Sequence, residues 1–315
     1  MFECLQDLTG GDLVFLLGVN SLLVDSTTSA SRTTRLIMVD AFRYAGRASG
    51  VQIATFFKTR FGWGPVFGIN LLLLLLNFIY ISCVVKEKRV AVEASNGCMK
   101  TTLGTLSSYK RLFRARSTRP LLLASLLSMA LFFFPSNGQG PLWYLIFRLQ
   151  YNIDMRKYAT MTTAWALRSV VTNLIILPAL IRFLPDTILI LVSLALTSLA
   201  FTLTAFGDTF LWMLLVGFLF ALNWPIEKIN NSLLSKLVSK DEVGTVFSLL
   251  AVMSKCLDFV AKPLYGLLYR ATVDTFPATF LFVSIVFLVA IFVIFIFIHI
   301  KMGKKNMLVV EIPEE

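Results

Sequence analysis

Nine apolar stretches run from Leu13 to His299, and only short connections that carry charge divide them. A helix needs roughly 20 apolar residues to cross a bilayer hydrocarbon layer of about 30 Å. Hydrophobic residues make up 57% of the chain and charged residues 15%. The stretches lack the two-residue alternation of barrel strands, so they predict membrane helices. We therefore expect an all-α, polytopic membrane protein.

The predicted spans differ in quality. They cover residues 12–24, 36–57, 64–85, 120–149, 159–181, 187–206, 209–226, 243–269 and 275–300. The first is shorter than a full crossing requires. The fourth is long, but residues 135–141, Pro-Ser-Asn-Gly-Gln-Gly-Pro, interrupt it, and we predict one broken helix there.

Basic residues are concentrated in two connecting segments. The loop 86–119 is rich in Lys and Arg, with Glu87 and Glu93 as its acids, and the tail adds Lys301, Lys304 and Lys305. By the positive-inside rule, both segments are expected in the cytoplasm. The net charge of +11 is therefore attributed to topology, and no nucleic-acid partner is expected.

The basic loop divides the chain into unequal parts. We expect a bundle of three helices over 1–85, a cytoplasmic linker over 86–119, a six-helix bundle over 120–302 and a tail over 303–315. Six spans are one half of a transporter built from two six-helix halves. Nine spans with a cytoplasmic C-terminus match helices four to twelve of such a transporter, so we expect the first three helices to be absent.

Three motifs resemble those of a known transporter family. Residues 25–35, DSTTSASRTTR, are similar to the inner loop between helices four and five of the proton-coupled folate transporter and thymic stromal cotransporter family, within the major facilitator superfamily. Residues 231–238 with 242–247 resemble its loop between helices ten and eleven. Residues 268–272 with Phe276 and Pro277 resemble its last outer turn. The motifs lie in order across nearly the whole chain.

This resemblance implies a proton-driven importer of organic anions with a major facilitator-like helical bundle. The acid that family members place in helix five matches Asp40, which the resemblance implies as a proton-coupling residue. The family's helix-seven His would fall near Pro135 and is absent, and its helix-ten Arg would fall near Asn231, one turn from Lys228. We expect no cofactor and a location in the plasma membrane or an endolysosomal membrane.

Charged residues recur at matched spacing inside two predicted spans. The triplets, at i, i+3 and i+7, are Asp40, Arg43 and Arg47 in span 36–57 and Lys255, Asp258 and Lys262 in span 243–269. This spacing places each triplet on one helical face. Charges inside a bilayer cost several kcal/mol unless they pair or line a wet cavity, so these residues are candidates for substrate binding.

Two interpretations of these charges remain open. Both triplets either line one central cavity or form internal ion pairs, Asp40 with Arg43 and Asp258 with Lys262. Arg168, in the middle of span 159–181, either lines the same cavity or makes a contact between helices. With Arg168 the cations exceed the acids by three, which favours an anionic substrate.

Polar residues outside the triplets add two further candidate sites. Asn137 and Gln139, at the predicted break, supply donors and acceptors for a substrate, unless the segment is only an extended helix end. Asp25, Arg32 and Arg35 in the loop after the first span form a candidate inner gate with the equivalent loop of the other half. The alternative is solvated loop charge.

Secondary transport of a small organic anion, folate-like or otherwise carboxylated, is the function these patterns favour. We expect Arg47 and Lys255 to make the main contacts and Asp40 to couple transport to protons. The alternative is a truncated, non-transporting protein or a regulatory partner of a full-length transporter. We expect no enzyme, because HExxH, GxSxG and P-loop motifs are absent, and no metal site, because the chain has one His.

Overall fold

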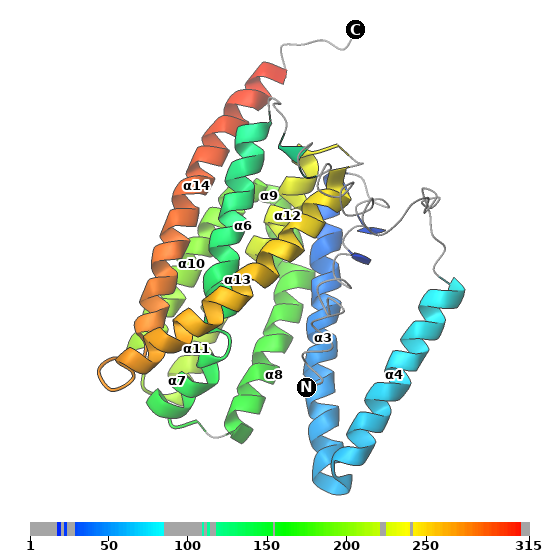
Figure 1. Cartoon of the computed structure of the whole chain (residues 1–315), viewed down its shortest axis with the longest axis vertical. Helices are drawn as coiled ribbons and strands as arrows, with labels where there is room; N and C mark the ends of the chain where they lie inside the picture. Colours follow the sequence, from blue (N-terminus) through cyan, green and yellow to red (C-terminus); the bar gives the residue numbers. More distant parts are fainter. Residues whose placement is uncertain are drawn as a thin grey trace.

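The computed structural model describes residues 18–19, 22–23, 29–84, 109, 112–113, 118–153, 155–220, 225–239 and 242–309. All regular structure in these ranges is helical (Figure 1). The main helices are α3 (Ser29–Phe61), α4 (Trp63–Val84), α6 (Arg119–Gln139), α7 (Leu142–Gln150), α8 (Met155–Val171), α9 (Leu177–Phe183), α10 (Asp186–Phe206), α11 (Phe210–Leu219), α12 (Pro225–Leu237), α13 (Val243–Thr272) and α14 (Thr279–Val309).

Six of the described helical segments are long and apolar enough to cross a membrane, and they match six of the nine predicted spans. They cover residues 63–83, 119–139, 160–183, 186–206, 243–272 and 279–302. The predicted span 36–57 lies within α3, a helix of 33 residues that carries several charges. The predicted span 209–226 contains the ten-residue α11, and most of span 12–24 lies outside the described residues.

The interruption in the fourth span is shorter than the sequence suggested. Helix α6 continues through Pro135 to Gln139, and only Gly140 and Pro141 separate it from α7. A proline inside a helix removes one backbone hydrogen bond, which neighbouring helices can offset within a packed bundle. Pro141 precedes α7 with a φ of −66°. Its missing N–H costs no hydrogen bond there, because the first N–H groups of a helix have no acceptor within the helix.

The fifth span contains a local change of helical pitch. Residues Thr172–Ile176 form a π-helical segment between α8 and α9, and Pro178 lies in the first turn of α9. The proline ring excludes the carbonyl one turn earlier, and the extra residue of a π-segment relieves that contact. The buried side chains of Thr172 and Asn173 lie in this segment.

Helices α3 and α4 form a hairpin in which α4 stands apart from the other helices (Figure 1). Gly62 joins them at a φ of +78°, a backbone conformation that favours glycine. Helix α4 packs mainly on α3, and none of its most apolar stretch is buried. By contrast, α3 packs along α8 and also contacts α12.

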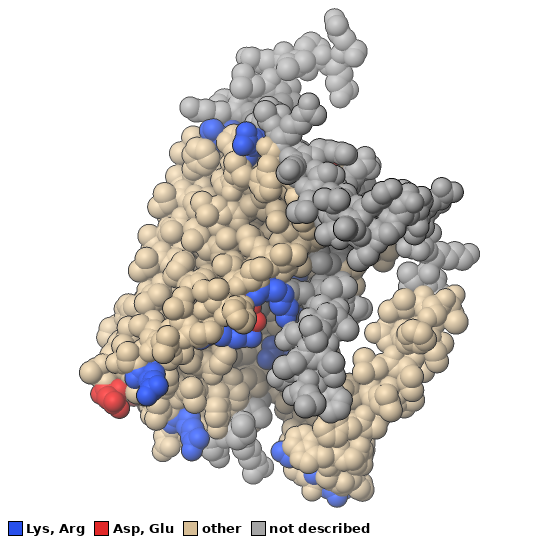
Figure 2. Space-filling model, in the orientation of Figure 1, with Lys and Arg blue, Asp and Glu red and all other residues tan. Residues whose placement is uncertain are grey.

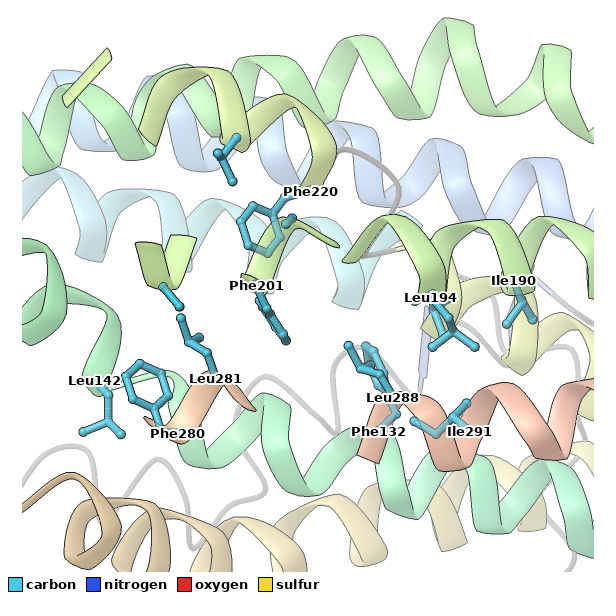
Figure 3. Close-up of a cluster of buried hydrophobic side chains, with 14 of the residues drawn as sticks. Phe132, Leu142, Ile190, Leu194, Phe201, Phe220, Phe280, Leu281, Leu288 and Ile291 are labelled. Atoms are coloured by element: carbon cyan, nitrogen blue, oxygen red, sulfur yellow. The ribbon is translucent and has the colours of Figure 1, made fainter. Parts of the chain in front are cut away.

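The apolar core lies between α6, α10 and α14 (Figure 3). Side chains that meet there include Phe132 of α6, Leu194 of α10 and Leu288 of α14, all nearly inaccessible. Two buried hydroxyls on α10 bond to their own helix: Ser193 Oγ donates to the Leu189 carbonyl at 2.7 Å, and Thr204 Oγ1 donates to the Ala200 carbonyl at 2.8 Å. Such internal bonds let polar side chains pack against neighbouring membrane helices.

Contacts at the helix ends give the relative directions of α7, α10 and α12. At one end, Lys236 Nζ lies 2.8 Å from Asp186 Oδ2, so the end of α12 meets the start of α10. At the other end, Gln150 Nε2 donates to the Gly207 carbonyl at 2.6 Å, so the end of α7 meets the end of α10. Helix α12 therefore runs antiparallel to α10, whereas α7 runs in the same direction as α10.

Candidate functional site

A cavity of about 340 Å³ lies between α3 and the helices of residues 119–309. Side chains from both parts of the chain form its walls: Tyr44, Arg47, Phe132, Ser136, Gln139, Gly140, Trp143, Tyr158, Thr162, Trp165, Ala166, Arg168, Ser169, Phe201 and Phe220. Of the predicted binding residues, Arg47, Gln139 and Arg168 are brought together here. Its volume is at the lower end of the roughly 300–1,000 Å³ typical of small-molecule sites.

Arg168 contributes a buried guanidinium to the cavity wall from the last turn of α8. Its Nε and Nη1 atoms are inaccessible and have no hydrogen-bond partner among the described residues. Burying a charged donor without an acceptor costs several kcal/mol. An anion in the cavity would supply the missing acceptor, and a guanidinium can hold a carboxylate through two parallel bonds.

Arg47 adds a second guanidinium to the cavity from α3. Arg47 is an exposed residue of α3, which packs along α8, and Gln52 Nε2 donates to Thr163 Oγ1 at 3.0 Å across that contact. In the described part of the chain, no carboxylate forms an ion pair with Arg47 or Arg168. The cavity therefore carries positive charge that its own walls leave unbalanced.

The end of α6 places two predicted polar residues in different surroundings. Gln139 is buried, lines the cavity, and has its Oε1 3.4 Å from Ser284 Oγ of α14. Asn137 turns instead toward α13, where its Nδ2 donates to the Ser254 carbonyl at 3.1 Å. Gln139 is thus available to a ligand, whereas Asn137 joins two helices.

Asp40 lies in a buried ion-pair network that links α3 to α12. Only 3% of Asp40 and 3% of Lys228 is exposed, and Lys228 Nζ lies 3.6 Å from Asp40 Oδ1. Arg43 Nη2 is 3.4 Å from the same oxygen, and Glu227 Oε1 is 3.6 Å from Lys228 Nζ. Sequence reasoning placed Lys228 near the family's helix-ten Arg but did not predict this pairing, because periodicity gives no partner on a distant helix.

The second charged triplet lies on α13, outside the cavity. Lys255 and Lys262 are exposed, and Lys262 Nζ lies 2.8 Å from Asp258 Oδ2. Figure 2 shows blue and red side chains gathered over α13 on this face of the molecule. The internal pair Asp258–Lys262 is therefore formed, and no residue of this triplet lines the cavity described above.

The predicted inner gate is described only in part. Asp25 and the side chain of Arg32 lie outside the described residues, and Arg35 is exposed on α3. At the end of α12, Lys236 pairs with Asp186 of α10. That ion pair joins two helices of the same part.

Aromatic rings form one side of the cavity, and sequence reasoning did not select them as a site. We call Trp143, Trp165, Phe201 and Phe220 the aromatic wall. The ring of Trp143 lies 5.9 Å from Phe201 and 5.8 Å from Phe220, which in turn is 6.4 Å from Trp165. The one available signal was the i, i+3 spacing of Trp165 and Arg168, which puts both on one face of a helix.

The comparisons with known proteins agree with this architecture. The structure of the human organic anion transporter MFSD10 (TETRAN) is similar at a TM-score of 0.72 and 15% sequence identity, over 89% of this chain and 67% of that one. No curated protein matches the chain. The family model of the Major Facilitator Superfamily matches residues 11–257. The chain is therefore a multi-pass membrane protein that belongs to the major facilitator superfamily.

Proposed function

We propose that this protein carries a small organic anion across the membrane by alternating access. The observation that supports this proposal is the pair of guanidinium groups, Arg47 and Arg168, that line one cavity without a carboxylate partner in the described part of the chain. Low-dielectric walls strengthen the field of these charges, so the cavity favours carboxylates and repels cations. Gln139 adds a neutral polar group beside them.

The Asp40–Lys228 ion pair supports a role for α3 and α12 in the transport cycle. It joins the two parts of the chain on either side of the linker 86–119, and alternating access requires such parts to move against each other. Protonation of Asp40 would weaken this link, and we propose it as the step that couples transport to protons. Within the superfamily, the matched motifs support assignment to the proton-coupled folate transporter family.

The topology and membrane follow from the same proposal. We propose that the C-terminus and the loop 86–119 face the cytoplasm, in the plasma membrane or an endolysosomal membrane. After all four cysteines, Cys4, Cys83, Cys98 and Cys256, are replaced by Ser, an impermeant thiol reagent should label Asn152→Cys in intact cells expressing the protein at the surface. Labelling of Ser239→Cys instead would reverse the orientation.

Competition uptake with the full chain tests the proposed anion selectivity. Benzoate, benzamide and benzylamine have similar shapes and differ in charge, and benzoate should compete best. Arg168→Gln should reduce benzoate uptake by about tenfold or more, because a charge-assisted hydrogen bond contributes about 1.5–3 kcal/mol. Arg270→Gln, at an exposed position near the end of α13, is the matched control and should keep normal uptake. Preference for benzylamine would reject the proposal.

A second candidate function is a non-transporting partner of another membrane protein. The apolar side chains of α4 are exposed along the helix, including Phe67, Leu72 and Phe78, and α4 packs mainly on α3. Such a surface fits lipid or another transmembrane helix. Reconstitution of the purified chain alone in liposomes separates the candidates. Uptake of benzoate by these liposomes supports transport. Absence of uptake, together with a change in the uptake of a full-length transporter when the two are expressed together, supports the partner role.

A further inference from the structure

We infer that the cavity binds the planar aromatic part of its anion against the aromatic wall, and that Gly217 sets the largest ring system that fits. This inference rests on the proposed function, because it names the class of anion that the same cavity would carry. It predicts selectivity for aromatic carboxylates of limited size.

The position of the aromatic wall relative to Arg168 supports an aromatic anion. Trp165 and Arg168 lie three residues apart on α8, and both line the cavity. Residues at this spacing lie side by side, with their Cβ atoms about 5–6 Å apart. A ring packed on Trp165 would therefore place a directly attached carboxylate within reach of the Arg168 guanidinium. Offset or edge-to-face contacts between rings add about 0.5–1.5 kcal/mol to the burial of apolar area.

Gly217 of α11 controls the position of one member of that wall. A Cβ atom added to Gly217 would overlap Trp165 Nε1 and would lie 3.1 Å from Cδ1 of the same ring. The Nε1 atom is buried and has no hydrogen-bond partner among the described residues, so packing alone holds the indole there. The ring of Phe147 lies 5.7 Å from that of Trp165, which leaves the cavity as the open direction for a displaced indole.

Equilibrium binding of two aromatic acids to the purified full chain tests the inference. Gly217→Ala should weaken binding of 2-naphthoate by about tenfold, because pockets discriminate a methylene-sized change by about 10–200-fold. Binding of benzoate should weaken by less than about twofold, and this retained binding also shows that the variant is folded. Gly266→Ala is the matched control, since a Cβ at Gly266 of α13 meets no atom within 4 Å.

A second variant keeps the test decisive if Gly217→Ala does not fold. Trp165→Phe enlarges the cavity, so it should bind 2-naphthoate at least as tightly as the unchanged protein, and it should restore 2-naphthoate binding to Gly217→Ala. Equal losses for both acids in Gly217→Ala, or weaker 2-naphthoate binding in Trp165→Phe, would overturn the size limit.

Two further probes separate this inference from the proposed function. Cyclohexanecarboxylate has the charge of benzoate without its aromatic ring, and equal binding of the two would reject the aromatic preference while the anion site stands. Benzyl alcohol has the ring without the charge. Benzyl alcohol binding as tight as that of benzoate would reject the anion site, and with it the proposed function, while ring binding stands.

Discussion

Helices α3 and α13 carry charged triplets at the same spacing, yet the structure gives the two triplets different surroundings. On α3, Asp40 is buried against Lys228 and Arg47 lines the cavity. On α13, Asp258 pairs with Lys262 within the helix, and both lysines of the triplet are exposed. The spacing determines which side chains share a face, but the neighbouring helix determines what that face does.

The difference arises from packing. Helix α3 packs against α8 and α12 and buries Asp40 there, whereas α13 packs against α6 with side chains such as Tyr265 and leaves both lysines of its triplet exposed. Exposed charge in contact with lipid would cost several kcal/mol, so the charged face of α13 requires water or protein beside it. The α3 triplet can therefore be tested for a role in the site, and the α13 triplet provides a matched reference.

The largest expected difference between the triplets is in stability. Lys228→Met leaves the Asp40 carboxylate buried with only Arg43 near it, and loss of one partner of a buried ion pair costs about 3–5 kcal/mol. Asp258→Asn removes an exposed pair, which contributes about 0–1 kcal/mol. Thermal unfolding in detergent measures both changes.

A compensating variant sharpens this stability test. Removing both charges, with Asp40→Asn in Lys228→Met, should recover part of the lost stability, because no uncompensated carboxylate then remains in the pair. If Lys228→Met and Asp258→Asn destabilise the protein equally, the contrast in burial between α3 and α13 has no energetic consequence.

The next difference concerns anion binding. Arg47→Gln should weaken benzoate binding by about tenfold, since Arg47 lines the cavity, and Arg47→Lys should rescue it only in part because an ammonium lacks the planar fork of a guanidinium. Lys255→Gln on α13 should change binding by less than about twofold, because Lys255 does not line this cavity. Equal losses for Arg47→Gln and Lys255→Gln would favour the shared cavity that the sequence suggested.

The helices were more predictable than the site. Long apolar runs separated by charge form membrane helices whatever they pack against, so α10 begins and ends within one residue of its predicted span, and α14 covers most of the predicted span 275–300 before continuing to Val309. Asp40, Arg47 and Arg168 were found because charge is rare inside apolar runs. Lys228 and the aromatic wall were missed because their roles depend on contacts between helices distant in sequence, and one aromatic residue among many gives no sign of which neighbours it meets.

The smallest expected difference is in the pH response of uptake. Asp40 interacts electrostatically with Lys228 and Glu227 of α12 and with Arg43 and Tyr44 of its own helix, so its protonation would remove one charge of a buried pair between the two parts of the chain. Weakening that link at mildly acidic pH should speed the movement of α3 against α12, and uptake should rise as the pH falls. Asp40→Asn mimics the protonated form and should transport at similar rates in acidic and neutral medium.

The matched control for this pH test is Asp258→Asn, which removes the acid of the α13 triplet and should keep the acid stimulation of the unchanged protein. The measurement is the ratio of benzoate uptake in mildly acidic medium to that in neutral medium, normalised to the amount of folded protein. A parallel series with the proton gradient collapsed separates an effect of pH on the protein from an effect on the driving force. A full acid response in Asp40→Asn would remove this carboxylate from coupling, and a lost response in Asp258→Asn would move the coupling step to α13.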